Sequence, residues 1–223
     1  MKELTKEQLL AISLLSTSPL VNKYYLTGGT LLSHRYLHHR LSLDLDFFTD
    51  QPVIFKEINN WINILRKKGN FTNITNQKIY DRWEFLLEGK NPLRIEFVYY
   101  SHDKKTIKKR VKFLGVYIDS LEDIAANKII SLMDRNEPKD LFDIYYLLTQ
   151  KKYTPDKLLL LCKKKFDIKF TQNLFWSECL KSLPLLTTLK PLILKKNKDL
   201  LIRKIQDYFK SESNTYLQTI INE

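Results

Sequence analysis

The stretch YLTGGTLLSHRYLHHRLSLDLDFF, residues 25–48, decides the fold of the N-terminal part of this chain. An aromatic and apolar segment at 23–26 predicts a short strand, the glycine pair after it predicts a turn, and Thr30 opens a helix that runs towards His38. Within 41–48, Leu41, Leu43, Leu45 and Phe47 alternate strictly with Ser42, Asp44 and Asp46, which predicts a second strand with one buried face. This order of elements indicates a domain built on a small mixed sheet.

Two aspartates, Asp44 and Asp46, occupy the polar face of the strand expected at 41–48. Side chains at positions i and i+2 of a strand point the same way, so two carboxylates would face one spot and repel each other. A basic partner, a raised pKa or a divalent cation would relieve that repulsion, and a set of oxygen ligands suits Mg²⁺ or Mn²⁺. Glu96, in the alternating segment 93–100, is a candidate third carboxylate for a two-metal site, and its alternative interpretation is a surface glutamate.

The turn at Gly28 and Gly29 is a candidate phosphate-binding element. Because it leads into a helix, backbone N–H groups and the positive end of the helix dipole would be available to phosphate oxygens, with the Thr30 hydroxyl beside them. A glycine pair is weak evidence alone. Together with two aspartates on the next strand, it predicts a site for a nucleoside triphosphate and metal ions.

Outside this stretch, helical and strand patterns alternate before the chain becomes wholly helical. A capping box formed by Thr5 and Gln8 predicts a helix at 6–16, and apolar spacing after Pro52 predicts another from residue 54 to 67. Further strands are expected at 79–87, 93–100 and 115–118. Helices are expected after Ser120, at 139–149 and throughout the region beyond Thr154. We therefore predict an α+β fold, with a mixed-sheet core at 1–118 and a helical domain at 119–223.

The charge is uneven along the chain. The formal net charge is +12, and residues 151–223 carry 15 Lys and Arg against 7 Asp and Glu. A positive C-terminal region suits a polyanionic partner such as RNA, although basic solvated surfaces are also common. The lysines expected to contact the RNA backbone include Lys163, Lys164, Lys165, Lys195, Lys196 and Lys198. The sequence contains no apolar run of membrane-spanning length and no signal-like N-terminus, so we expect a cytoplasmic protein that does not bind membranes. Cys162 and Cys179 are expected to be free thiols.

The residues quoted above resemble the first motif of the AbiEii-type nucleotidyltransferases, the toxins of abortive-infection toxin–antitoxin pairs. The matching positions are Gly28, Gly29, Thr30, Arg40, Ser42, Asp44, Asp46 and Phe47. The segment SLEDIAANKIISLMDRNEPKDLFDIYYLL, residues 120–148, is similar to the family's second conserved region. Its matching positions are Lys128, Arg135, Lys139, Asp140, Asp143 and Tyr145.

The resemblance implies a polymerase-beta-like nucleotidyltransferase core and a role for each matching residue. Asp44, Asp46 and Glu96 would bind the metal ions, and Lys128 and Asp143 would join them as catalytic residues. Contacts to the nucleotide would come from Gly28, Gly29, Thr30, Arg40, Ser42, Lys128 and Asp140. Without the resemblance, Lys128 would be interpreted as a snorkelling lysine at a helix edge, and Asp140 and Asp143 as salt-bridge partners of Arg135 and Lys139.

The function implied is Mg²⁺- or Mn²⁺-dependent transfer of NMP from NTP to RNA, with the tRNA 3′ acceptor end as the expected acceptor. The resemblance also implies a toxin with a cognate antitoxin protein as partner. Two alternatives stay open: nucleotidylation of a protein or small molecule, and a non-catalytic nucleotide-binding protein. The sequence does not indicate which base is transferred, how many nucleotides are added or the oligomeric state.

Overall fold

The computed structural model describes residues 4–100 and 106–222, and the chain forms two compact units. The first unit ends at Ile124 and the second begins at Ala125. Helix α4 (Leu121–Asp134) therefore crosses the division. The sequence places the boundary between residues 118 and 119, just ahead of this helix.

The first unit is built on a mixed sheet with seven strands in the described residues. Their order across the sheet is β3-β4-β5-β2-β1-β7-β6. The strands are β1 (Tyr25–Thr27), β2 (Leu45–Thr49), β3 (Asn73–Ile79), β4 (Arg82–Glu88), β5 (Leu93–Tyr99), β6 (Val111–Phe113) and β7 (Val116–Ile118). The pairs β2/β5 and β1/β7 are parallel, and the other neighbouring pairs are antiparallel. Together with the helices that follow, this sheet confirms the predicted α+β class.

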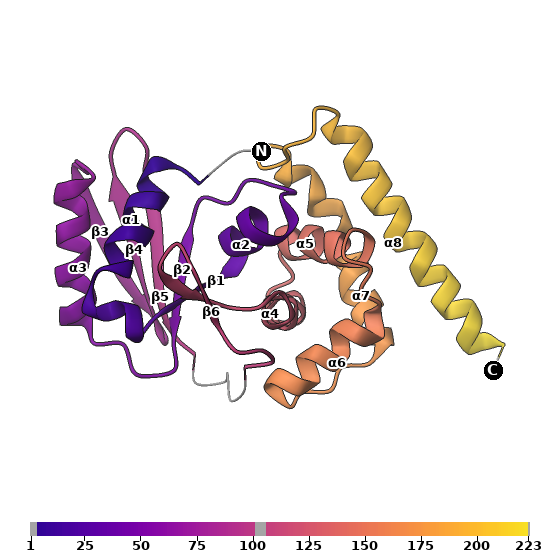
Figure 1. The fold of residues 1–223 in the computed structure, drawn as a ribbon. Coiled ribbons are helices and arrows are strands. Elements are labelled where there is room, and N and C mark those ends of the chain that lie inside the picture. The colour runs from indigo at the N-terminus through magenta and orange to yellow at the C-terminus, as the bar shows by residue number, and fades with distance from the viewer. Residues whose placement is uncertain (1–3, 101–105, 223) are drawn as a thin grey trace. The chain divides into compact units, whose positions relative to one another are not determined.

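Helices α1 (Lys6–Ser16) and α3 (Phe55–Lys68) cover the apolar face of the sheet (Figure 1). Trp61 of α3 meets Phe47 and Phe97 edge to face, with ring centroids 6.2 and 5.6 Å apart. Such aromatic contacts add to the stabilisation from burying apolar area. The capping box of Thr5 and Gln8 forms as predicted and begins α1.

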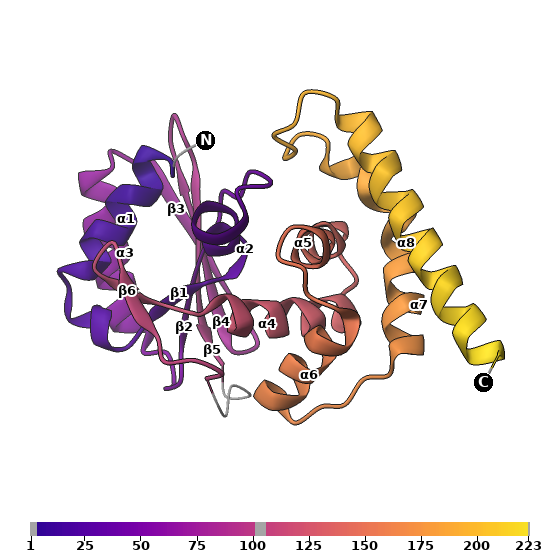
Figure 2. The ribbon, with the colours of Figure 1, turned by 45° about the vertical axis from the view of Figure 1, so that its right-hand side comes forward.

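The opposite face of the sheet carries helix α2 (Gly28–Leu31), which continues as a π-helical segment, Leu32–Leu37 (Figures 1 and 2). This helix begins at Gly28 rather than at Thr30, directly after β1. It ends at His38, whose φ of 53° is left-handed. The turn, the helix and the polar side of the sheet therefore share one face.

The prediction of a continuous strand at 41–48 is wrong in its first half. Strand β2 begins at Leu45, and Leu43 is 53% exposed although the alternation predicted it to be buried. The backbone carbonyls of residues 42 and 43 accept hydrogen bonds from the Gln8 side-chain amide, both at 3.1 Å, and the Asp44 carbonyl accepts one from the Thr30 hydroxyl. Side chains thus satisfy carbonyls that a neighbouring strand would otherwise bind.

Two strands, β3 and β6, were not predicted from the sequence patterns. Strand β3 lies at an edge of the sheet and is mostly exposed, so it lacks the apolar alternation that marks a half-buried strand. Strand β6 is short and sits at the opposite edge. The strand expected at 79–87 is β4, preceded by a turn at Tyr80 and Asp81 that joins it to β3.

The second unit is helical. It contains most of α4, then α5 (Pro138–Thr149), α6 (Pro155–Phe166), α7 (Gln172–Ser182), a 3₁₀ segment (Leu183–Leu189) and α8 (Lys198–Ile221). Asn136, with a φ of 50°, separates α4 from α5, and Pro138 begins α5 as predicted. Both cysteines are free and buried, as expected. None of the helices in the described part of the chain is long and apolar enough to span a bilayer.

Candidate nucleotidyl-transfer site

A row of polar side chains crosses the face of the sheet opposite α1 and α3. The β2/β5 register places Asp46 beside Glu96, and the β5/β4 register places Glu96 beside Glu84. The row continues to Gln77 on β3, whose side-chain amide donates to a Glu84 carboxylate oxygen at 2.8 Å. Side chains that are paired across strands lie on one face, so these residues are neighbours in space although they are distant in sequence.

At the other end of the row, beyond Asp46, lie Thr27 and the buried Asp119. Thr27 of β1 is in register with Asp46, and its hydroxyl donates to Asp119 at 2.8 Å. Arg110 contacts the other Asp119 oxygen at 3.2 Å and also stacks on the Tyr25 ring. Asp119 is fully buried and ion-paired, so we assign it a structural role.

Asp46 packs directly on the glycine turn. A Cβ at Gly28 would lie 1.8 Å from Oδ2 of Asp46, and Gly28 has a φ of +73°. A side chain at this position would meet both a steric and a conformational barrier. The glycine therefore allows the carboxylate to approach the first turn of α2 closely, which the sequence pattern could suggest but not show.

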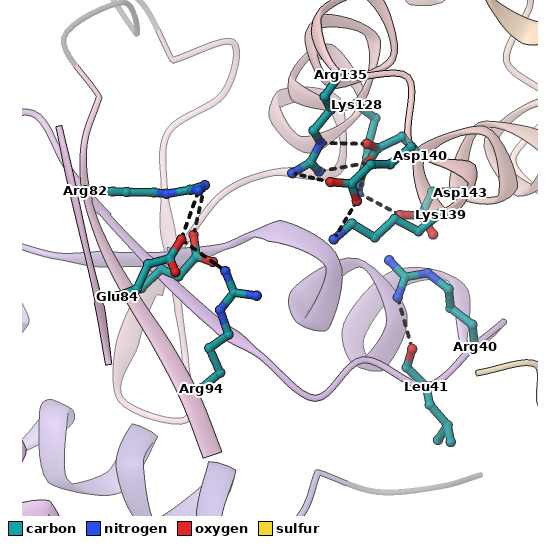
Figure 3. Close-up of polar contacts among 12 residues, drawn as sticks. Arg40, Leu41, Arg82, Glu84, Arg94, Lys128, Arg135, Lys139, Asp140 and Asp143 are labelled. Carbon is teal, nitrogen blue, oxygen red and sulfur yellow. Dashed lines mark hydrogen bonds and ion pairs between the residues drawn. The ribbon is translucent and has the colours of Figure 1, made fainter. Parts of the chain in front are cut away.

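The second glycine, Gly29, lies close to two further residues of the motif, Arg40 and Ser42. A Cβ at Gly29 would lie 2.7 Å from the Arg40 guanidinium and 3.1 Å from the Ser42 hydroxyl. Arg40 is 4% exposed and donates to the Leu41 carbonyl at 3.0 Å (Figure 3). Arg40, Ser42 and Asp46 of the motif are thus gathered around its glycine turn, whereas Phe47 packs in the core against Trp61.

The N-terminus of α2 has the properties of an anion site. Its N-cap residue, Thr27, makes no capping hydrogen bond, because the hydroxyl is directed to Asp119. The first N–H groups of a helix need partners that capping side chains, water or ligands supply. The Arg40 guanidinium adds positive charge beside them, so the turn is suited to phosphate oxygens.

Glu96 differs from the two aspartates in its surroundings. Its carboxylate lies 2.7 Å from Arg94 and 3.7 Å from Arg82. Arg94 and Arg82 also contact Glu84, at 3.1 and 2.9 Å (Figure 3). Burial raises the pKa of Glu96 above its ordinary value. The two arginines oppose this rise, whereas the nearby carboxylates of Glu84 and Asp44 reinforce it.

These contacts bear on the predicted metal site. Asp44 and Asp46 are half-buried oxygen donors, and Mg²⁺ is commonly held by one or two carboxylates together with substrate phosphates. The two aspartates therefore fit a divalent cation. Among the described residues, no group of three or more acidic, histidine or cysteine side chains is arranged to hold a metal. Glu96 as the third ligand stays a prediction, since its carboxylate would have to leave Arg94.

The second unit contains the other predicted residues as a buried ion cluster. The Lys128 ammonium lies 2.7 Å from Asp140 and 2.8 Å from Asp143, and both aspartates are fully buried (Figure 3). Arg135 contacts Asp140 at 3.0 Å, and Lys139 pairs with the exposed Glu137. The Lys128 side chain is only 7% exposed, so its interpretation as a snorkelling lysine is wrong.

The charges of this cluster balance. Burial alone would raise the pKa of Asp140, but Lys128 and Arg135 more than offset it and hold that pKa below its ordinary value. Asp140 thus pairs with both Lys128 and Arg135, so its interpretation as a salt-bridge partner of Arg135 is confirmed, and its contact with the nucleotide stays a prediction. Tyr145, the last residue of the motif, packs edge to face on Tyr208 at 5.3 Å and is part of the core of this unit.

The lysines expected to contact RNA differ in how exposed their side chains are. Lys163, Lys164, Lys195 and Lys196 are exposed, and Lys198 donates to the Lys190 carbonyl at 2.6 Å. Lys165 is 2% exposed, so the expectation that it contacts RNA is wrong. Glu84 and Arg94 were missed, although the alternation of residues 82–88 could have placed Glu84 opposite Glu96 if the strands had been paired as a hairpin.

Comparison with known proteins shows the family to which the sequence belongs. Residues 8–221 match the family described as the nucleotidyl transferase AbiEii toxin of type IV toxin–antitoxin systems. Over 185 residues the chain is 30% identical to aq_aa25, an uncharacterized protein of Aquifex aeolicus (strain VF5), covering 82% of this chain and 83% of that protein.

Two solved structures from Helicobacter pylori have a similar fold. JHP933 superposes with a TM-score of 0.58 at 17% identity and covers 98% of this chain and 96% of its own. A protein provisionally assigned as a nucleotidyltransferase superposes with a TM-score of 0.57 at 18% identity, over 92% of this chain and 94% of its own. At these identities the likeness concerns the fold.

Proposed function

The chain belongs to the AbiEii nucleotidyltransferase toxin family, and we propose that it transfers NMP from NTP to the 3′ end of RNA, with the tRNA acceptor end as the expected target. One observation carries this proposal. Asp46 lies against Gly28 while Arg40 and Ser42 lie against Gly29, so acidic and phosphate-binding groups meet at one turn. A triphosphate donor needs both kinds of group in one place.

The donor's phosphates are assigned to the glycine turn. The first N–H groups of α2 would bind phosphate oxygens, and the nearby Arg40 guanidinium and Ser42 hydroxyl would bind others. Thr30 would contribute by positioning Asp44 rather than by binding phosphate. Its hydroxyl donates a hydrogen bond to the Asp44 backbone carbonyl and holds that residue near the turn.

Asp44 and Asp46 are the proposed ligands for Mg²⁺ or Mn²⁺, which when bound would neutralise charge on the reacting phosphates. The acceptor hydroxyl oxygen forms a bond to the α-phosphorus as the bond from that phosphorus to the bridging oxygen breaks. Pyrophosphate leaves, and the hydroxyl proton passes to a carboxylate, for which Glu96 is the proposed acceptor. The arginine contacts of Glu96 mean that this last role requires Arg94 to shift.

Lys128 is proposed to bring positive charge to the phosphates, with Asp140 and Asp143 as the groups that orient it. The support is their short contacts and complete burial, which fix the ammonium in one place. Such orientation lowers the entropy that a flexible lysine would otherwise lose on binding.

The exposed lysines of the second unit are proposed to bind the RNA backbone. Phosphate contacts of this kind make affinity fall as salt rises. We also propose that the protein acts as a toxin and is held in check by a cognate antitoxin protein. Expression without the antitoxin should slow growth, and the Asp46→Asn variant should relieve that effect if catalysis is its cause.

Labelled NTPs test the reaction directly. The protein is incubated with tRNA, Mg²⁺ and each α-labelled NTP in turn, and the label on RNA is measured for the wild type, Asp46→Asn and Asp81→Asn. Asp81 is an exposed carboxylate in the turn before β4 and serves as the matched control. Transfer that survives Asp46→Asn would refute the proposed site. Label that remains on protein after RNase treatment would favour the alternative acceptor.

A further inference from the structure

A pocket of about 530 Å³ opens on the sheet of the first unit, beyond the proposed reaction site. Its lining includes Thr75 and Gln77 of β3, Glu84 and Leu86 of β4, and Arg94 of β5. The register pairs Thr75 with Leu86 and Gln77 with Glu84, so these side chains share a face. Because Glu84 and Arg94 contact each other, the pocket adjoins the row that leads to Asp46.

The pocket and the glycine turn lie on opposite sides of β2. The turn follows β1, which flanks β2 on one side, whereas β5, β4 and β3 follow in order on the other side. In an in-line displacement the attacking oxygen enters opposite the leaving group. If the leaving pyrophosphate rests at the turn, the acceptor hydroxyl must approach from the side of β5.

We propose that this pocket, here called the β3–β5 pocket, binds the 3′-terminal nucleotide of the RNA acceptor and helps to select it. The proposal rests on the proposed function and adds the place of the second substrate. Strand β3 is an edge strand, so a single-stranded RNA end can enter from the margin of the sheet. Single-stranded ends are also the form in which RNA bases are open to recognition.

The lining supplies the chemistry that a nucleotide needs. Leu86 is 41% exposed and offers an apolar surface under a base. Gln77 donates one N–H to Glu84, and its carbonyl oxygen can accept a hydrogen bond from a base amino group. The exposed Thr75 hydroxyl can both donate and accept.

Arg94 is the residue that would hold the acceptor's phosphate. Its side chain is 41% exposed although it contacts Glu84 at 3.1 Å and Glu96 at 2.7 Å. The two carboxylates therefore fix the guanidinium while part of it faces solvent, and a guanidinium has five N–H donors to share among such partners. Binding of a phosphate would draw Arg94 from Glu96, the shift that the proposed proton acceptor requires.

The test fills the pocket and measures each substrate separately. Thr75→Trp puts a large ring at an exposed edge-strand position, where an aromatic residue is well tolerated. Asn73→Trp makes the same change on the same strand and face, outside the pocket lining. Leu86→Trp is a second filling variant from the neighbouring strand. Thermal melting confirms that the variants are folded.

We expect Thr75→Trp to raise KM for the RNA acceptor on the order of tenfold, the loss typical of one stacked base. KM for NTP should stay unchanged, and Asn73→Trp should match the wild type. A rise in KM for NTP would assign the pocket to the donor base and overturn the proposal. So would an unchanged KM for RNA in both filling variants.

A second measurement separates this proposal from the proposed function. A single-stranded RNA with a photoreactive base at its 3′ terminus is cross-linked to the wild type, and the modified peptide is identified. Cross-links in 75–77, in 84–86 or at Arg94 support the pocket whether or not label transfer is seen, and cross-links confined to other positions refute it. Failure of all label transfer, with the cross-link in place, would count against the reaction and leave RNA binding at the pocket supported.

Discussion

The two units of this protein use aspartates in opposite ways. In the first, Asp44 and Asp46 are half-buried, and Asp46 lies against a glycine turn whose helix N-terminus lacks a side-chain cap. In the second, Asp140 and Asp143 are fully buried and lie within 2.8 Å of one lysine. The same residue type therefore appears once as a group left accessible to a ligand and once as an internal counter-charge.

The difference follows from the cost of desolvation. A buried carboxylate must be matched by a nearby cation, because its loss of hydration is otherwise unfavourable by several kcal/mol, as a rough figure. A carboxylate that binds a metal must instead keep space and some hydration until the metal arrives. Glu96 stands between these cases, since it is largely buried and held by arginines in the middle of the acidic row.

The largest effect is expected from Asp46→Asn. It removes negative charge at the proposed cation site with little change in shape, so the transfer rate should fall on the order of a thousandfold. The free energy of unfolding should change by less than about 1 kcal/mol. The rate is measured by label transfer and stability by urea denaturation. A large loss of stability would show that Asp46 resembles Asp140 after all.

Lys128→Met should lower stability as well as the transfer rate. It leaves two buried aspartates without their shared cation, so the free energy of unfolding should fall by about 3–5 kcal/mol. Adding Asp140→Asn and Asp143→Asn should recover part of that loss, because the uncompensated charges disappear. Lys139→Met, at a one-third exposed lysine, is the control and should cost less than about 1 kcal/mol. If the triple variant has a lower free energy of unfolding than Lys128→Met alone, the uncompensated charges of Asp140 and Asp143 are not the cause of the loss.

Gly28→Ala tests how the turn positions Asp46. The new Cβ would overlap the Asp46 carboxylate and require a left-handed backbone, which together should cost about 1–3 kcal/mol of stability. Transfer activity should fall as well, since Asp46 must move. Gly89→Ala, where a Cβ would meet its nearest neighbour at 3.4 Å, is the matched control. Equal behaviour of the two variants would show that the contact has no role.

The smallest effect concerns acid stability. The pKa of Asp140 is lower when the protein is folded, so its stabilising contribution is complete above the unfolded pKa and is lost as the pH falls through the folded value. Urea denaturation between neutral and acidic pH should show this loss in the wild type. Asp140→Asn should have a shallower acid dependence, and an identical slope in both proteins would argue against the ion pairs.

Local patterns predicted most of the elements of the first unit. The capping box marked the start of α1, helical spacing marked α3, and alternation marked β5 within one residue of its end. These signals succeed because capping and amphipathic periodicity involve residues close together in the chain. The residues around the glycine turn were also predicted, since the motif places them in one short stretch.

Other features depend on neighbours distant in sequence. The first half of the strand expected at 41–48 is irregular, because the side chains of Gln8 and Thr30 donate hydrogen bonds to its backbone carbonyls. The pairing of Glu84 with Arg94 depends on how β4 and β5 align, and the burial of Lys165 depends on the packing of its helix. None of these partners is visible in the local pattern.

The sequence by itself determined the class of fold, the start of α1 and the chemical groups available for nucleotidyl transfer, because side-chain type and short-range periodicity are properties of the chain. Only the tertiary structure decided which carboxylates stay accessible and which are paired with cations. Burial and cross-strand register are set by non-local packing, and they separate Asp46 from Glu96 and Lys128 from a surface lysine.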